Sequence, residues 1–399
     1  MEKSLRYITF ASLYFTQGTI LGYFASLNAI YLLERGLTLE AIGIFGAIAL
    51  IPFVLKIFLG MLSDKVNLFG LGHRKPYIVI GLIIQTLCLI AVSFTDPQAN
   101  FGLFVALGFT LQLGMAWYDT CTDGLALDTT PIEEEGTIQG FMVGGRAVGV
   151  IAASGIAGVV AQNFSWQAMF WTLAALTMLP FLFLMNVKEP QRTSEHEFKL
   201  EAFAAFKQTT ILVVSALGFV VFFIIIGANQ LVNPFLEAEF EISLSSAGFF
   251  GMVWGIGVVL GSISGSTLMA RLGKQNAVKL GLAMSFAAIL LLAFISNPNL
   301  AWVLVPLFGL AYGVQQTVYF ALAMEYTDTR IAASMFAILM AFTNVGQGAG
   351  LAVSGALAGS LGYRWTFVIL AALNILAVPL LPMIFKPAPG EIPEIAAAE

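Results

Sequence analysis

The chain is 399 residues long, 59% of its residues are hydrophobic, only 10% are charged, and its formal net charge is −5. Together with a mean hydropathy of +0.89, this composition lies outside the range of soluble domains. It excludes a soluble enzyme domain, gives no basis for a nucleic-acid partner, and indicates an all-α membrane protein with many transmembrane helices.

Apolar stretches of about twenty residues or more recur from one end of the chain to the other. As a helix, each is long enough to cross a hydrocarbon core of roughly 30 Å. We predict twelve transmembrane helices, over residues 6–33, 39–62, 76–95, 101–127, 136–161, 166–187, 209–235, 244–269, 276–296, 300–324, 331–359 and 365–385. Their connections are short except for the polar segment 188–208, which we predict to be a linker. The tail 387–399 is expected to be disordered.

The basic residues of the predicted loops set the orientation of the chain in the membrane. Fourteen Lys and Arg residues lie on the side that holds both termini, whereas the opposite side holds only Arg35 and Arg364. Because cytoplasmic loops carry an excess of Lys and Arg, we expect a cell-membrane protein with both termini in the cytoplasm.

Asp119 and Arg146 are two charges that the span pattern places at similar depth in the membrane. They lie 13 and 14 residues from the predicted turn near residue 132, which corresponds to roughly 14 Å above the membrane boundary. Asp123 follows one turn below Asp119 on the same helix face. Ionisable groups at this depth are costly and mark functional sites. We therefore predict that Asp119, Asp123 and Arg146 handle a proton, an ion or a charged part of a substrate, the alternative being a fixed structural Asp119–Arg146 pair.

Lys56 is a further charge within a span, about two turns from the end of the second predicted helix and after Pro52. Its long side chain could reach the membrane interface, as Lys side chains near helix ends do. The other interpretation is that Lys56 is a partner for Asp123.

The second half of the sequence resembles the first at a distance of about 200 residues. Asp128-Thr-Thr-Pro, followed by Ala153-Ser-Gly and Ser165-Trp166, corresponds to Glu325-Tyr-Thr-Asp, followed by Val353-Ser-Gly and Arg364-Trp365. We predict two pseudo-symmetric six-helix bundles, over 1–187 and 209–386, joined by the linker. Repeats of this kind are typical of secondary transporters.

The loop between the second and third spans resembles that of the major facilitator superfamily. It carries Gly60-x-x-x-Asp64-Lys65 and then Arg74-Lys75, although Leu68 to Gly72 are extra residues relative to the family pattern. The version Gly72-His73-Arg74-Lys75-Pro76-Tyr77 is similar to the glycoside–cation symporter and folate–biopterin branches. The run from Asp119 to Asp128, Asp-Thr-Cys-Thr-Asp-Gly-Leu-Ala-Leu-Asp, resembles muropeptide permease and acetyl-coenzyme A transporter relatives.

The resemblance implies a central cavity lined by helices 1, 4, 7 and 10, with a monomer as the expected state. Ten amide and aromatic side chains are candidates for this cavity: Tyr14, Gln17, Asn229, Gln230, Asn233, Gln315, Gln316, Tyr319, Asn344 and Gln347. Interhelical hydrogen bonding is the alternative role for each of them.

The resemblance also implies a cytoplasmic gate, which we call the loop cluster. Its candidate members are Gly60, Asp64, Lys65, Arg74, Lys75 and Glu325. Glu325 occupies the position that echoes Asp128, whereas Ala270 replaces the acid in the second-half copy of the loop. The alternative is a solvated basic loop.

These patterns predict a secondary transporter of a small solute, working by alternating access and most simply as a proton-coupled symporter. No nucleophile–base pair, catalytic histidine or second acidic motif for a metal pair is visible, so we expect no enzyme activity, no metal and no cofactor. Protons, the solute and the lipid bilayer are the expected partners. A transporter-like membrane scaffold or assembly factor without solute transport is the alternative function.

Overall fold

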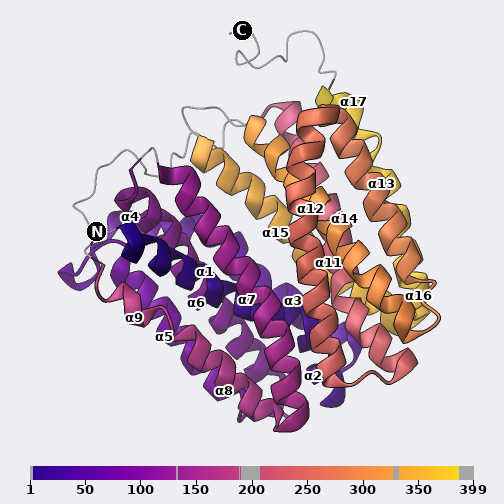
Figure 1. Ribbon diagram of the computed structural model, residues 1–399, viewed down its shortest axis with the longest axis horizontal. Helices are drawn as coiled ribbons and strands as arrows, with labels where there is room; N and C mark the ends of the chain where they lie inside the picture. Colours follow the sequence, from indigo (N-terminus) through magenta and orange to yellow (C-terminus); the bar gives the residue numbers. More distant parts are fainter. Residues whose placement is uncertain (1–2, 132–133, 188, 190–206, 327–331, 386–399) are drawn as a thin grey trace.

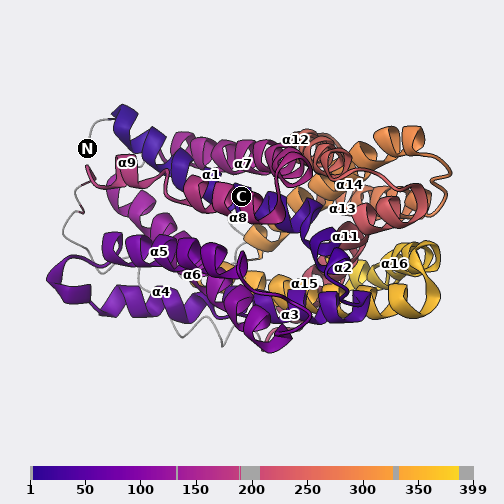
Figure 2. The same ribbon diagram turned by 90° about the horizontal axis from the view of Figure 1, so that it is seen from below.

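The computed structural model describes residues 3–131, 134–187, 189, 207–326 and 332–385. The predicted tail and all of the predicted linker except Glu189, Lys207 and Gln208 lie outside the described residues. The regular elements of the described part are helices, arranged in two groups that lie side by side (Figures 1 and 2).

The first group of helices shares one hydrophobic core, whose buried side chains run from Phe10 to Val187 with Ala247 added from the second group. Its elements are α1 (Lys3–Ser26), α2 (Asn28–Glu34), α3 (Leu39–Val54), α4 (Lys56–Lys65), the short 3-10 helix Leu68–Gly70, α5 (Lys75–Val92), α6 (Phe101–Thr129), α7 (Glu135–Asn163), α8 (Trp166–Thr177) and α9 (Phe181–Leu184). We call this group the first bundle.

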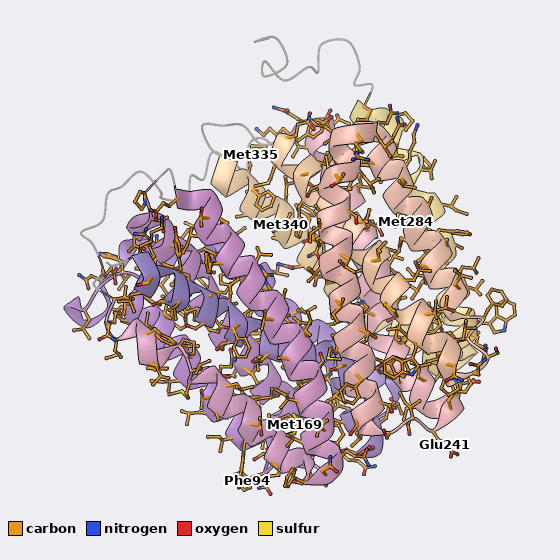
Figure 3. All side chains as sticks on the ribbon, viewed as in Figure 1. Phe94, Met169, Glu241, Met284, Met335 and Met340 are labelled. Atoms are coloured by element: carbon orange, nitrogen blue, oxygen red, sulfur yellow. The ribbon has the colours of Figure 1, made fainter. Side chains whose placement is uncertain are left out.

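The second bundle has its own core, formed by buried side chains between Ile211 and Ile384. Its elements are α11 (Thr209–Phe240), α12 (Leu244–Leu272), α13 (Lys274–Leu292), α14 (Pro298–Glu325), α15 (Ala332–Leu361), α16 (Tyr363–Ala377) and α17 (Leu380–Phe385). Met169 lies in the core of the first bundle, and Met284 packs, partly buried, against the core of the second (Figure 3).

Eleven spans in the described part of the chain are long and apolar enough to cross a membrane. The remaining one is α1, which carries Thr9, Ser12, Thr16, Gln17 and Thr19 in buried positions. These polar side chains lower its hydropathy, but they face the interior of the bundle, where α1 packs along α7. With α1 as the twelfth, the prediction of an all-α protein with twelve transmembrane helices in two bundles is confirmed.

Four predicted spans are interrupted in the structure. Two interruptions contain Pro180 and Pro379, because proline lacks the N–H that continues a helical ladder. A third lies at Leu55, three residues after Pro52. The fourth lies at Leu27, between α1 and α2, where the Ser26 hydroxyl donates a 2.5 Å hydrogen bond back to the Gly22 carbonyl. α11 remains one helix through Pro234.

The two bundles meet at one end and diverge toward the other, where α1 begins and α17 ends (Figure 1). Phe94 and Glu241 lie at the closed end, whereas Met335 and Met340 of α15 lie toward the open end (Figure 3). Between bundles, α7 packs on α12 and α3 packs on α15. The contact is close because it uses glycine: a Cβ on Gly248 would lie 2.5 Å from the Ser154 carbonyl oxygen.

Hydrogen bonds between the bundles, within the described residues, follow the same pattern. Near the closed end, Asn233 Nδ2 donates to the Ser26 carbonyl at 2.6 Å, and the Leu244 N–H donates to Gln162 Oε1 at 2.9 Å. The deepest is from Asn344 Nδ2 to the Phe53 carbonyl at 3.1 Å. We call this contact between the bundles, α7 on α12 and α3 on α15, the seam. It runs from the closed end to about the middle of the helices.

We expect Gly248→Ala to destabilise this arrangement, because the added methyl group meets backbone and α7 and α12 must separate. The cost should be about 1–3 kcal/mol, as in overpacked cores, and it is read as a lower melting temperature of the purified protein in detergent. Gly359→Ala is the control, since nothing lies within 4 Å of a Cβ added there. Equal melting temperatures for both variants would contradict the close packing.

Candidate functional site

Lys56 bridges two carboxylates in the interior of the first bundle. Its ammonium nitrogen lies 2.5 Å from Asp119 Oδ2 and 3.3 Å from Asp123 Oδ2. The two aspartates are one turn apart on α6 and therefore share a face. Lys56 is the first residue of α4, immediately after the interruption that follows Pro52.

α1 completes this arrangement with two neutral side chains. Gln17 Nε2 donates a 2.9 Å hydrogen bond to Asp119 Oδ1, and the Tyr14 hydroxyl donates to Asp123 Oδ1. Three helices that are distant in sequence thus converge on two carboxylates. We call Tyr14, Gln17, Lys56, Asp119 and Asp123 the charge network.

The two aspartates differ in their access to solvent. The side chain of Asp119 is 6% exposed, whereas those of Asp123 and Lys56 are 40% and 30% exposed. Asp119 also holds the shorter contact to Lys56. Asp123 is therefore the carboxylate of this site that a proton or solute can reach.

Two sequence interpretations need correction. Lys56 does not extend toward the membrane surface but points inward at the aspartates. The charge-assisted hydrogen bonds to two nearby carboxylates stabilise the ammonium there. Asp119 pairs with Lys56, and no ion pair joins it to Arg146. Arg146, on α7, places its guanidinium 5.1 Å from the centre of the Tyr14 ring.

The predicted loop cluster is tied together within the first bundle. Arg74 donates to Asp128 Oδ2 at 3.3 Å and to Ser63 Oγ at 2.8 Å. Lys75 Nζ donates to the backbone carbonyls of Met185 and Val187 at 2.9 and 3.0 Å. Its members from this bundle thus hold the loop to the ends of α6 and α9.

The four other predicted members do not join these contacts. A Cβ on Gly60 would contact Thr120 at 3.1 Å, and Lys65 is exposed. The side chain of Asp64 lies outside what the structure describes. Glu325 pairs with Lys274 at 2.5 Å, where α14 ends and α13 begins.

Glu189 joins the loop cluster without a sequence signal that identifies it. Its carboxylate accepts hydrogen bonds from the backbone N–H groups of His73, Arg74 and Lys75 at 2.6, 2.9 and 3.0 Å. These groups form the start of α5, where unpaired N–H groups and the helix dipole favour an anion. Sequence alone shows only an acid after the sixth span, more than a hundred residues from its partners.

The ten predicted cavity residues do not gather at one place. Gln230 Nε2 donates to the Leu351 carbonyl and Ser354 Oγ, both at 2.6 Å, and so ties α11 to α15. Asn233 and Asn344 belong to the seam between the bundles, and Gln347 donates to Asn344 Oδ1 at 3.0 Å. Tyr14 and Gln17 belong to the charge network, and Asn229 lines a small pocket together with Asn233. On α14, Gln316 is half-buried, whereas Gln315 and Tyr319 are buried in the core of the second bundle.

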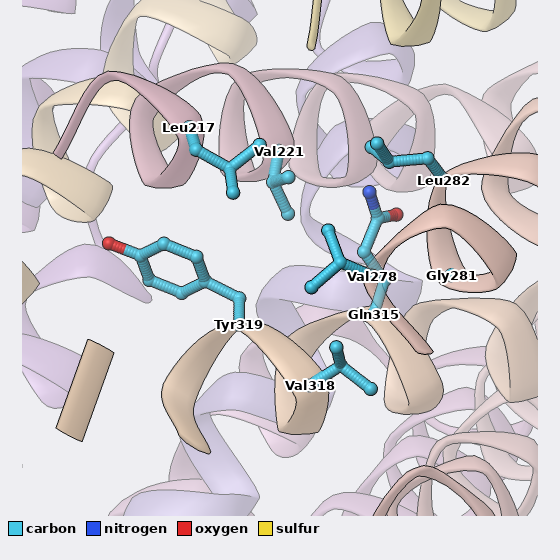
Figure 4. A pocket seen from close by; sticks show the side chains of 8 residues that line it. All are labelled: Leu217, Val221, Val278, Gly281, Leu282, Gln315, Val318 and Tyr319. Atoms are coloured by element: carbon cyan, nitrogen blue, oxygen red, sulfur yellow. The ribbon is translucent and has the colours of Figure 1, made fainter. Parts of the chain in front are cut away.

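Gln315 and Tyr319 line a cavity of about 10 Å³ inside the second bundle (Figure 4). The Gln315 amide points into it and has no hydrogen-bond partner among the described residues. The other lining residues are apolar apart from Gly281. This space is about large enough for one water molecule and too small for a solute.

We expect Lys56→Met to destabilise the protein by roughly 1–3 kcal/mol, because a buried carboxylate loses its charged donor. Lys65→Met, at an exposed lysine, should leave the melting temperature in detergent nearly unchanged. Adding Asp119→Asn to Lys56→Met should recover part of the loss, because the unpaired charge is removed. A double variant no more stable than Lys56→Met would argue against the ion pair.

Comparisons with known proteins agree with this architecture. Residues 9–337 and 309–399 match the model of the Major Facilitator Superfamily. The sialic acid transporter NanX of Escherichia coli K12 is 25% identical over 64% of this chain and 62% of its own length. The anhydromuropeptide permease of the same organism is 23% identical over 78% of this chain and 66% of its own. The chain thus spans just under two thirds of either relative.

A plant relative and solved structures add to this. A probable folate-biopterin transporter 7 of Arabidopsis thaliana is 27% identical over 35% of this chain and 32% of its own length. The crystal structure of the nucleoside transporter NupG superposes with a TM-score of 0.79 over 96% of this chain and 99% of its own, at 16% identity. A bacterial homologue of the human lysosomal transporter Spinster, inward-facing and unoccupied, gives a TM-score of 0.73 over 96% and 98%. At such identity the likeness concerns the fold.

Proposed function

Because the chain belongs to the major facilitator superfamily, we propose that it is a secondary active transporter that moves a small solute by alternating access, coupled to protons. The moving units are the predicted domains 1–187 and 209–386, and segment 188–208 connects them. The charge network is the coupling site, and Asp123 takes up the proton.

The shape of the contact between the bundles supports alternating access. Its hydrogen bonds, within the described residues, lie between the closed end and mid-depth, as at Asn233 and Asn344. The excess of basic residues in the loops of that side favours a cytoplasmic orientation of the open end. In this interpretation the structure is the inward-open state, and transport requires the seam to part while the opposite end closes.

The observation that carries proton coupling is that Lys56 serves two carboxylates of unequal exposure. A proton on Asp123 would remove one of the two charges that hold Lys56 and would weaken the acceptor of the Tyr14 hydrogen bond. α1, α4 and α6 would then lose a shared restraint. Protonation and helix movement are linked in this way, because the Asp123 carboxylate that takes up the proton also holds the three helices together.

The loop cluster fits a gate on the cytoplasmic side. Arg74 donates to Asp128 and Ser63, and Lys75 donates to two backbone carbonyls after α9, all in the first bundle. In the opposite state of such a gate these bases would face the ends of α14 and α15. Glu325, now paired with Lys274 at the end of α14, is an acid of the second bundle that could receive them.

The solute is open to test among those named for relatives and neighbours. Sialic acid, anhydromuropeptides, folates and nucleosides are the first candidates, and the amides and aromatic rings near the seam suit polar organic solutes of this kind.

In proteoliposomes with an imposed pH gradient, we expect Asp123→Asn to abolish uphill uptake of the transported candidate. Exchange of labelled for unlabelled solute should continue, because it requires no net proton movement. Glu40→Gln, which neutralises an exposed acid at the start of α3, is the control and should retain both activities. Normal uphill uptake by Asp123→Asn would refute proton coupling at this site.

A further inference from the structure

Arg146 is a charged side chain at mid-membrane depth that the charge network leaves without an acid. It lies in the middle of α7, and its guanidinium makes no ion pair or hydrogen bond with a described residue. The described aspartates nearby are occupied by Lys56, Tyr14 and Gln17. Arg146 is half-buried, and an arginine at this depth without a carboxylate is costly unless a ligand supplies one.

Arg146 lies beside the contact between the two bundles. Tyr14 of α1 lies beneath its guanidinium. One turn further along α7, Val150 lies 3.3 Å from a Cβ added to Gly255 of α12. Trp254, next to Gly255, contacts Tyr312 of α14 edge to face, with ring centres 5.3 Å apart. Arg146 is therefore one helical turn from the second bundle, near aromatic side chains of both.

We propose that Arg146 binds the carboxylate of an anionic organic solute between the bundles, and that one proton on Asp123 accompanies each anion. The proposal rests on the proposed transport function and adds the charge of its substrate and the stoichiometry of coupling. The planar guanidinium offers two parallel N–H donors to a carboxylate. The ammonium of Lys56 is already shared by Asp119 and Asp123 and has less to offer.

Charge balance fixes the stoichiometry. Lys56 and Arg146 contribute two positive charges, and Asp119 and Asp123 contribute two negative ones. The empty site is therefore neutral, and a bound monoanion leaves it with one negative charge in a region of low dielectric. One added proton restores neutrality. It binds to Asp123, because Asp123 is the more exposed of the two carboxylates. The loaded site then crosses the membrane without net charge.

The first test is binding, measured as thermal stabilisation of the full-length protein in detergent. The probes are sialic acid, benzoate and folate, each beside a neutral ester or amide of the same skeleton. We expect at least one acid to raise the melting temperature while its neutral partner does not. Stabilisation by neutral or cationic forms alone, or by none of the acids, overturns the proposal.

Variants of Arg146 assign the effect. Arg146→Gln should reduce the affinity for the stabilising acid at least tenfold, and Arg146→Lys should keep part of it. Arg271→Gln, at an exposed arginine near the end of α12, should bind as the unchanged protein does. Should Arg146→Gln fail to fold, the Arg146→Lys affinity decides, because an undiminished affinity would show that the guanidinium geometry is irrelevant.

The second test is transport of the stabilising acid into proteoliposomes. Electroneutral symport predicts uptake that responds to an imposed pH gradient and not to a potential set with potassium and valinomycin. Uptake driven by the potential overturns the stoichiometry but keeps transport. Binding through Arg146 with no uptake under either gradient overturns the transport function and leaves the anion site standing, so the two failures are distinguishable.

Discussion

One ammonium shared by two carboxylates is the interaction on which the polar interior of the first bundle depends. Charges at this depth are costly without close partners, since the hydrocarbon core of the bilayer offers no water to replace them. Asp119 and Asp123 therefore require Lys56, and Lys56 reaches them because α4 starts at this residue after the helix is interrupted. Tyr14 and Gln17 of α1 donate hydrogen bonds to the other carboxylate oxygens of Asp123 and Asp119. These bonds explain why both polar side chains face the interior of the bundle.

Glycine at the bundle interface sets the second constraint. Helices that meet through backbone rather than long side chains lie close together and have smooth surfaces. Here such contact joins α7 to α12 and α3 to α15, while each bundle keeps a separate core of large apolar side chains. The seam is consequently the place where the molecule can come apart at least cost, and the two cores can move as units.

The fold could be predicted from sequence because hydropathy and length define the spans directly, and the repeat indicates the two bundles. The partners within the site could not. Depth along a helix follows from counting residues, and it places Asp119 and Arg146 at one level. Counting does not say which helix face meets which, and in the structure Tyr14 lies against Arg146 while Lys56 pairs with Asp119.

The same limit explains why the predicted cavity residues are scattered. An amide in a span is polar whether it faces the space between bundles or its own neighbours, so Gln230 and Gln315 cannot be told apart by composition. Glu189 shows the opposite case, because its role at the start of α5 depends on backbone groups that carry no side-chain signature.

The carbonyl of Ser26 links the shape of a single helix to the position of the whole second bundle. It accepts a hydrogen bond from Asn233 at the point where α1 gives way to α2. If the bundles separate as in the proposed cycle, that oxygen loses this donor, and the amide of Ile30, one turn further along the chain, can replace it. α1 and α2 would then continue as one helix, so that in the proposed cycle the interruption at Leu27 would differ between the two states.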